Sequence, residues 1–330
     1  MSEFHVSVIR LGKIEKHPNA DTLSVVRVNG DYPVIFRTGD FKEGDLAVYV
    51  PVDSEVPDTE QWAFLKGHRR IKAKKLRGIF SMGVLAPLPI TVIRDSIKVE
   101  EGMDAQELMG ITKWEPKLPL HWRGENERDP GFMPLYTDLE GLRRYPDVLQ
   151  EGEEVVLTEK VHGANGRFCW HEDRLWVGSH RCIKKETEQN LWWTAARKEN
   201  LAEKLQLIPD LVMYGEVYGQ VQDLLYSHNK GEVSICFFDA YRIDKGSYLD
   251  YDEFMAVCLK AGLKAVPEIY RGPWRSDLKS ESNGPTIIGG YRHMREGFVA
   301  KPVKERWNEH IGRVILKLVG EDYLLRNQKE

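Results

Sequence analysis

The chain has 330 residues, enough for about two domains, and its 42% hydrophobic and 30% charged residues are ordinary for a globular protein. Its formal net charge of −4 excludes a global basic field, so any contact with nucleic acid requires a local basic patch. The four cysteines form no CxxC pair, which argues against a zinc site or a disulfide framework and fits a reducing compartment. No apolar run approaches the ~20 residues of a membrane helix, and the start MSEFHVSVIRLG lacks a signal-peptide core. We therefore expect an intracellular protein, cytoplasmic by default, with no membrane partner.

The first segment, residues 1–115, is predicted to be a small all-β domain. The runs LSVVRV (23–28), PVIFRT (33–38) and LAVYVPV (46–52) are typical of short strands, and glycine or proline separates them. Short strands at this spacing predict a barrel or a sandwich. Residues 95–111 are expected to add a connecting strand and a helix that closes the domain.

Six basic residues lie close together in the stretch GHRRIKAKKLRGIFSMGVL (67–85). Several alternate with Ile71, Ala73 and Leu76, as on a strand with one face in water. A solvated edge strand explains such a run, and so does a patch that neutralises phosphate backbones. The nearby stretch HPNADTLSVVRV (17–28) resembles the start of the OB-fold tRNA-binding domains found beside some synthetases. Within such a domain we favour nucleic-acid binding, by Arg69, Arg70, Lys72, Lys74, Lys75 and Arg77.

The junction at 112–134 holds four prolines and two glycines and has no sustained periodicity, so we take 116–134 as a linker. The second domain then spans 135–330. Residues 136–152 predict a helix capped by Thr137 or Asp138, ending before Pro146. Further along, the patterns predict a strand at 153–157, a hairpin at 166–181 that turns at His171 to Asp173, helices at 191–210 and 251–263, and strands at 211–219, 233–243 and 313–324.

Lys160 stands where the strand at 153–157 ends, and Gly163 and Gly166 then break the chain into a turn. Taken alone, Lys160 reads as a solvated surface lysine. Four later segments also present one charged residue amid apolar neighbours, and a buried charge is costly unless it is paired. Together they favour a polar cleft lined by an antiparallel sheet, formed by Lys160, Arg181, Glu216, Glu296 and Lys317.

The ordered motifs TEKVHG, SHR, YGEVYG, FFDA, EGFVAKP and LKLV resemble motifs I, Ia, III, IIIa, IV and V of the covalent nucleotidyltransferases. These enzymes are the ATP-dependent polynucleotide ligases and the mRNA capping enzymes. EKVHGxN and EGFVxKP are most similar to the RNA ligase branch. DNA ligases and capping enzymes carry an OB domain after motif V, where only 13 residues follow Lys317 in this chain. An OB-like segment at the start instead resembles RNA ligases that seal 3′-OH/5′-phosphate breaks in duplexes with RNA on the 3′-OH side.

The resemblance implies an α+β protein, with an N-terminal OB-like β-barrel and a nucleotidyltransferase (ATP-grasp-like ligase) domain. Lys160 would attack the α-phosphorus of ATP, giving lysyl-AMP and then a 5′-adenylylated nucleic acid. A free lysine has a pKa of ~10.4, so we expect the site to lower the pKa of Lys160. Mg²⁺ or Mn²⁺ is expected on Glu296. The expected partner is RNA or an RNA-containing duplex, bound by a monomer, and the implied catalytic residues are Lys160, Glu216, Glu296 and Lys317.

Other expected contacts divide between the nucleotide and the nucleic acid. The resemblance places Glu159 on the adenine edge and Phe238 on the adenine ring, with Phe237 as the alternative if the strand register differs. Glu216 would hold the ribose hydroxyls or assist the metal, and Asn165 would hold the 5′-phosphate end. The cations expected to contact phosphates are Arg181 and Lys317, with Lys301 as a weaker candidate.

The chain departs from the pattern of the family in two ways. His162 replaces the aspartate that is commoner in motif I, which argues against a metal contact from this position. Motif V has one lysine instead of two, so one phosphate contact is either missing or supplied from elsewhere, by Arg313 or Lys304. Rival functions are a DNA ligase or capping guanylyltransferase, and a non-catalytic OB-fold RNA-binding protein with a decayed ligase domain. The intact Lys160, Glu216, Glu296 and Lys317 favour an enzyme.

Overall fold

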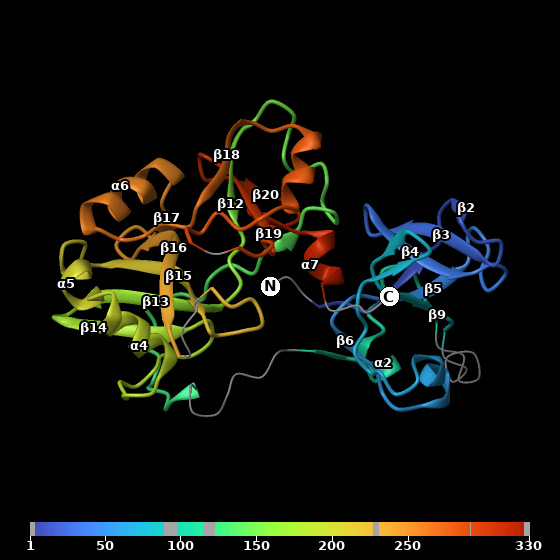
Figure 1. Ribbon diagram of the computed structural model, residues 1–330, viewed down its shortest axis with the longest axis horizontal. Helices are drawn as coiled ribbons and strands as arrows, with labels where there is room; N and C mark the ends of the chain where they lie inside the picture. The colour runs from blue at the N-terminus through green and yellow to red at the C-terminus, as the bar shows by residue number, and fades with distance from the viewer. Residues whose placement is uncertain (1–3, 89–97, 115–122, 227–230, 291, 327–330) are drawn as a thin grey trace. The chain divides into compact units, whose positions relative to one another are not determined.

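The computed structural model describes residues 4–88, 98–114, 123–226, 231–290 and 292–326. The chain divides into two compact units (Figure 1). The first unit comprises Met1–Pro116, Gly141–Pro146 and Leu324–Glu330, and the second comprises Lys117–Glu140 and Asp147–Tyr323. Along the chain, the change from the second unit to the first falls within the short strand β11 (Glu140–Gly141), between its two residues.

The first unit consists mainly of short antiparallel strands. In β3, Ser24, Val26 and Val28 are buried, which is the alternation expected for a strand with one face in the core. The sheets pack on apolar clusters that include Val26 and Val34 on one side and Val8 with Val48 on the other. One sheet contains β1 (Ser7–Arg10), β5 (Leu46–Val50) and β9 (Val84–Ala86), and another contains β2 (Ile14–Lys16), β3 (Leu23–Val28) and β4 (Tyr32–Arg37).

The predicted barrel is not closed in the described part of this unit. Besides the two sheets above, β7 (Lys74–Leu76) and β8 (Ile79–Ser81) form a separate pair, and so do β6 (Ser54–Glu55) and β10 (Thr112–Lys113). Glu55 of β6 also forms an isolated bridge with Arg70. The basic stretch forms separate short strands because Arg77 and Gly78 turn the chain with φ angles of 44° and 88°. The unit also contains η1 (Glu60–Leu65) and the predicted closing helix, α2 (Gln106–Met109). The connecting strand expected before α2 lies partly outside the described residues.

The second unit contains two antiparallel sheets. Strands β18 (Glu268–Pro273), β12 (Glu154–Glu159), β19 (Gly297–Pro302) and β22 (Leu316–Val319) lie side by side in the first sheet. The second sheet has the order β14 (Arg174–Ser179), β13 (Ala164–His171), β15 (Leu211–Gly219), β16 (Val233–Arg242) and β17 (Ser247–Tyr248). Helices α4 (Leu191–Lys198), α5 (Leu201–Gln206) and α6 (Tyr251–Ala261) pack on the second sheet (Figure 1).

Two helix predictions differ from the structure. Residues 136–152 form turns and β11 instead of a helix, because Tyr136, Leu142 and Leu149 are drawn into buried positions that tertiary contacts define. The helix expected at 191–210 is divided into α4 and α5, because Asn200 adopts a left-handed conformation with φ of 51°.

The remaining elements of the second unit are short. They are η2 (Ser276–Ser282), β20 (Trp307–Asn308), β21 (Gly312–Arg313) and the start of α7 (Glu321–Leu325), whose last two residues are counted with the first unit. Across the described residues, no helix combines the length and apolar character that crossing a membrane requires.

Candidate active site

Lys160 directly follows β12, which lies between β18 and β19 in the first sheet of the second unit. Its backbone N–H donates to the carbonyl of Gly297 at 3.0 Å, which ties the end of β12 to the start of β19. Its ammonium Nζ lies 2.6 Å from Glu296 Oε1. The turn after Lys160 requires a glycine at 163, because a Cβ there would lie 2.2 Å from the carbonyl oxygen of Val217. The sequence therefore fixes Lys160 at a strand end against the Glu296 carboxylate.

The second oxygen of Glu296 faces His162. Glu296 Oε2 lies 3.2 Å from His162 Nδ1, and the Tyr323 hydroxyl lies 3.1 Å from the same nitrogen. Both His162 and Glu296 are buried. The histidine that departs from the family pattern therefore contacts the carboxylate that pairs with Lys160.

The Lys160–Glu296 pair stabilises the charged forms of both groups. Burial alone would raise the pKa of Glu296, but the charge of Lys160 and the contact with His162 outweigh it and lower the pKa to about 2. Burial alone would lower the pKa of Lys160, but attraction to Glu296 outweighs it and raises the pKa above its ordinary value. The expectation of a lowered lysine pKa is therefore wrong for this arrangement. Lys160 must lose a proton before it acts as a nucleophile, and parting from Glu296 removes the attraction that raises its pKa.

Glu216 lies close enough to Lys160 and Glu296 for both charges to shift its pKa. Burial raises the pKa of Glu216 to about 8, Lys160 opposes the rise, and Glu296 adds to it. On the adjacent strand β13, Asn165 stands directly opposite Glu216. The Oδ1 atom of Asn165 is buried and has no hydrogen-bond partner among the described residues.

Replacing Glu216 by Gln is expected to stabilise the protein at alkaline pH. The folded pKa of about 8 exceeds the unfolded value near 4.5, so the folded state binds the extra proton and loses stability as pH rises between these values. Gln cannot ionise, so the melting temperature of Glu216→Gln relative to wild type should increase by about 2–4 °C between pH 5 and pH 9. Differential scanning fluorimetry measures this difference. Glu203→Gln, an exposed change on α5, is the control and should give a constant difference; a constant difference for Glu216→Gln as well would contradict the prediction.

Glu159, beside Lys160, accepts hydrogen bonds from a segment that the sequence analysis did not single out. Its carboxylate accepts from Thr286 Oγ1 at 2.5 Å and from the Ile287 backbone N–H at 2.8 Å. The side chain is buried, with 2% of its surface exposed. A carboxylate offers about four acceptor directions, so these two contacts orient Glu159 and leave acceptor capacity for another donor. The predicted contact with adenine stays a prediction.

The structure distinguishes Phe238 from its alternative, Phe237. The register between β15 and β16 shifts so that Tyr214 pairs with Asp239 and Gly215 pairs with Phe237, which leaves Phe238 as the extra residue of a β-bulge. Phe237 is buried in the core. Phe238 is half-buried and packs on Tyr136 with ring centroids 4.9 Å apart. Of the two rings, only Phe238 is partly exposed.

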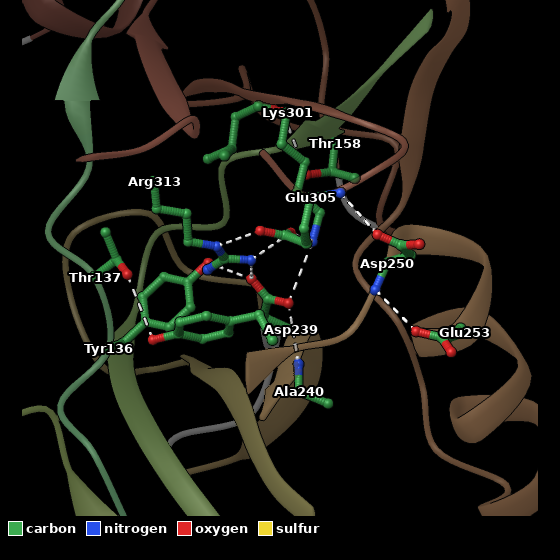
Figure 2. A network of polar contacts seen from close by, with 12 residues as sticks. Tyr136, Thr137, Thr158, Asp239, Ala240, Asp250, Glu253, Lys301, Glu305 and Arg313 are labelled. Atoms are coloured by element: carbon green, nitrogen blue, oxygen red, sulfur yellow. Dashed lines mark hydrogen bonds and ion pairs between the residues drawn. The ribbon is translucent and has the colours of Figure 1, made fainter. Parts of the chain in front are cut away.

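A buried ionic network accounts for two cations that were candidates for phosphate contacts (Figure 2). Asp239 Oδ2 lies 2.6 Å from Arg313 Nη2, and Asp239 Oδ1 lies 3.2 Å from Lys301 Nζ. Glu305 also pairs with Arg313 at 2.6 Å. Lys304 is exposed and pairs with Asp250 at 2.9 Å. Arg313 and Lys301 are therefore both held by the buried Asp239 carboxylate. The expectation that Arg313 or Lys304 replaces the second motif V lysine stays a prediction.

The other two predicted phosphate contacts occupy different places in the second unit. Arg181 is exposed just beyond β14 of the second sheet. Lys317 is half-buried in β22 of the first sheet, directly opposite Val299. The structure thus groups Lys160, Glu216 and Glu296 by direct contact or charge, whereas the roles of Arg181 and Lys317 stay predictions.

The carboxylates near Lys160 suit a cation whose remaining ligands come from a substrate. In the described ranges, no group of three or more His, Cys, Asp and Glu side chains is arranged to hold a metal ion. Mg²⁺ is usually held by one or two carboxylates together with water and substrate phosphates. Glu296 and Glu216 provide two such carboxylates beside Lys160. The residues therefore fit a hard divalent cation that is bound together with a nucleotide.

In the first unit, the six basic residues divide into two groups. Arg70 bonds to Asp53 at 2.7 Å and stacks on Trp114 with its guanidinium carbon 3.2 Å from the ring centroid. Arg69 lies 3.5 Å from Glu55. These two arginines are thus tied to carboxylates. Buried Ile71 and Ala73 alternate with an exposed set that consists of Lys72, Lys74, Lys75 and Arg77.

Comparisons with known proteins match both units. A model of the RNA ligase family matches residues 153–319, and a model of an OB-fold domain matches residues 5–88. The phenylalanine–tRNA ligase beta subunit of Symbiobacterium thermophilum is 36% identical over 127 residues, which is 35% of this chain and 14% of that relative's length.

Solved structures of Naegleria gruberi RNA ligase resemble the chain along almost its whole length. A mutant with ATP and Mn, a mutant with AMP and Mn, and the protein with PPi each superpose with a TM-score of 0.83. In each case the identity is 25%, over 98% of this chain and 99% of the other. These matches confirm the predicted α+β class, with an OB-fold domain first and a ligase domain second.

Proposed function

The chain belongs to the RNA ligase family and has the architecture of an ATP-dependent RNA ligase, and we propose that it seals 3′-OH/5′-phosphate nicks in duplexes with RNA on the 3′-OH side. The observation that carries the proposal is the Lys160–Glu296 pair, 2.6 Å apart at the end of β12 and inside the matched region. The similar Naegleria structures hold ATP or AMP with Mn. That similarity supports the same nucleotide and a divalent ion, Mg²⁺ or Mn²⁺, for this chain.

The proposed reaction uses Lys160 as the nucleophile. Its neutral amine attacks the α-phosphorus of ATP, a nitrogen–phosphorus bond forms, and pyrophosphate leaves. A 5′-phosphate then takes the AMP group from Lys160, and a 3′-OH finally displaces AMP to form the phosphodiester. Positioning and charge neutralisation supply most of the catalysis in such phosphoryl transfers.

The surrounding residues are assigned to holding the nucleotide. Glu296, assisted by Glu216, would hold the divalent ion, which neutralises phosphate charge when bound. Glu159, oriented by Thr286 and Ile287, would accept from the adenine amino group. Phe238 would stack on the base.

The polymer contacts are assigned to both units. Arg181 and Lys317 would contact phosphates, and Asn165 would hold the 5′-phosphate end. In the first unit, the exposed Lys72, Lys74, Lys75 and Arg77 are proposed to contact phosphate backbones through charge neutralisation. Arg69 and Arg70 are proposed to shape this surface, because they are paired with Glu55 and Asp53.

Nick sealing with defined ends tests the proposal. The full chain is incubated with ATP, Mg²⁺ or Mn²⁺, and duplexes whose nick carries either RNA or DNA on its 3′-OH side. We expect ligation of the RNA-ended nick at least about tenfold faster, a preference of ~1.4 kcal/mol. Equal rates on both nicks would favour a DNA ligase, and labelling of the protein by GTP in place of ATP would favour a capping enzyme. If the protein takes label from neither labelled ATP nor labelled GTP, the result would contradict all three functions: RNA ligase, DNA ligase and capping enzyme.

A further inference from the structure

The polar contacts of Lys160 continue to a residue that none of the sequence motifs contains. Lys160 Nζ contacts Glu296 Oε1 at 2.6 Å, and Glu296 Oε2 lies 3.2 Å from His162 Nδ1. On the other side of the imidazole, His162 Nε2 lies 2.7 Å from Asp223 Oδ1. Asp223 lies in the loop that follows β15, and its side chain is 48% exposed, compared with 11% for Glu296. The contacts thus form a line from a half-exposed carboxylate to the nucleophile.

Two neighbours of Asp223 in the sequence also contact the turn that contains His162 and Gly163. The side-chain amide of Gln222 donates to the carbonyl of Gly163. The backbone N–H of His162 donates to the hydroxyl of Tyr226, which is fully buried, at 3.1 Å. Three side chains from the segment 222–226 therefore contact the turn at 162–163. Asp223 is the one of the three that reaches the imidazole ring.

The position of Asp223 determines how the ring can serve Glu296. An imidazole nitrogen that faces a carboxylate oxygen acts as a donor, and both ring nitrogens of His162 face carboxylates. Rotation of the ring would lose both contacts. A carboxylate behind a functional histidine commonly fixes its ring orientation. Asp223 has the geometry for that role.

We propose that Asp223 is a positioning residue for lysine adenylation: it holds His162, and through it the Glu296 carboxylate, so that Lys160 Nζ is kept in place until ATP binds and the lysine loses its proton. The inference rests on the proposed function, because it takes Lys160 as the nucleophile. A positioning role for Asp223 differs from a merely structural role in one respect. A structural aspartate would affect every step equally, whereas a positioning residue for Lys160 affects chiefly the step in which the lysine attacks ATP.

The experiment compares two steps in four full-length proteins: wild type, Asp223→Ala, Asp223→Asn and Asp210→Asn. Asp210 provides a matched control, because its Oδ1 lies 2.7 Å from His171 Nδ1 in the same unit and outside the site. The first readout is the rate of label transfer from α-labelled ATP to the protein, over a range of ATP concentrations. The second is sealing of a nick that already carries a 5′-adenylate, in which Lys160 is not the nucleophile.

We expect Asp223→Ala to slow self-adenylation at saturating ATP about tenfold, or ~1.4 kcal/mol in the barrier, with KM for ATP changed by less than about twofold. Asp223→Asn should recover most of the rate, because its amide oxygen still accepts from His162. Asp210→Asn should match wild type, and Asp223→Ala should seal the adenylylated nick within about twofold of wild type.

Two results would overturn the inference while leaving the proposed function intact. One is self-adenylation of Asp223→Ala at the wild-type rate. The other is an equal loss in self-adenylation and in sealing of the adenylylated nick. Wild-type protein that takes no label would overturn the proposed function, and this inference with it.

Discussion

Lys160→Arg is expected to abolish transfer of AMP to the protein while leaving the fold intact. Arginine keeps a positive charge for Glu296, whose Oε1 lies 2.6 Å from Lys160 Nζ. A guanidinium stays protonated in proteins and supplies no lone pair for attack on phosphorus. Label from α-labelled ATP on the denatured protein should therefore fall at least ~10³-fold, as is typical when a nucleophile is removed.

Lys185→Arg is the matched control for this substitution. Lys185 also pairs with a glutamate, at 2.9 Å from Glu125, but both side chains are exposed. This variant should take label like wild type. Lys160→Arg should in addition seal a nick that already carries a 5′-adenylate, because that step does not use the lysine as nucleophile. Label retained on Lys160→Arg would assign the nucleophile to another residue.

The strands of both units are the part of the fold that the sequence predicted best. Strands β3, β4, β15 and β16 start and end within a residue of the predicted limits. They were predictable because apolar β-branched residues in these runs are either alternating or continuous, and turn residues bound them. The failures occurred where distant contacts outweigh local preference. Tyr136 donates to Asp239, far away in the sequence, and the segment that contains Tyr136 is not helical.

The site was predictable only as far as the motifs extend. Lys160, Glu216 and Glu296 were named from the resemblance, and the structure brings them together. Thr286, Tyr226 and Asp223 were not named, because each comes from a loop whose composition carries no periodic signal. Their importance arises from contacts with Glu159 and His162 that only the folded chain creates. The sequence also gave no sign that Lys160 rests in an ion pair that raises its pKa.

Asp239→Ala is expected to lower the free energy of unfolding by about 3–5 kcal/mol, a larger loss than for any other substitution above. Asp239 is fully buried in β16 of the second sheet, and it contacts Lys301 of β19 in the first sheet as well as Arg313 and the hydroxyl of Tyr136 (Figure 2). Burial alone would raise the pKa of Asp239, but the two cations outweigh it and lower the pKa, so the carboxylate is charged at neutral pH. Its removal leaves two buried cations without that partner.

Chemical denaturation of the full chain measures this loss in the transition of the second unit. Asp252→Ala is the control, because Asp252 pairs with Arg271 at 2.8 Å on the surface and should cost at most about 1 kcal/mol. Since the folded pKa of Asp239 is depressed, its contribution is present above the unfolded pKa and is lost as pH falls through the folded value. The deficit of Asp239→Ala should therefore narrow in acid. An equal loss of unfolding free energy for both variants at neutral pH would contradict the stabilising role of this network.

Because Phe238 precedes Asp239 in the same bulge, loosening of this network should also weaken the proposed stacking on adenine, and KM for ATP should rise with the loss of stability.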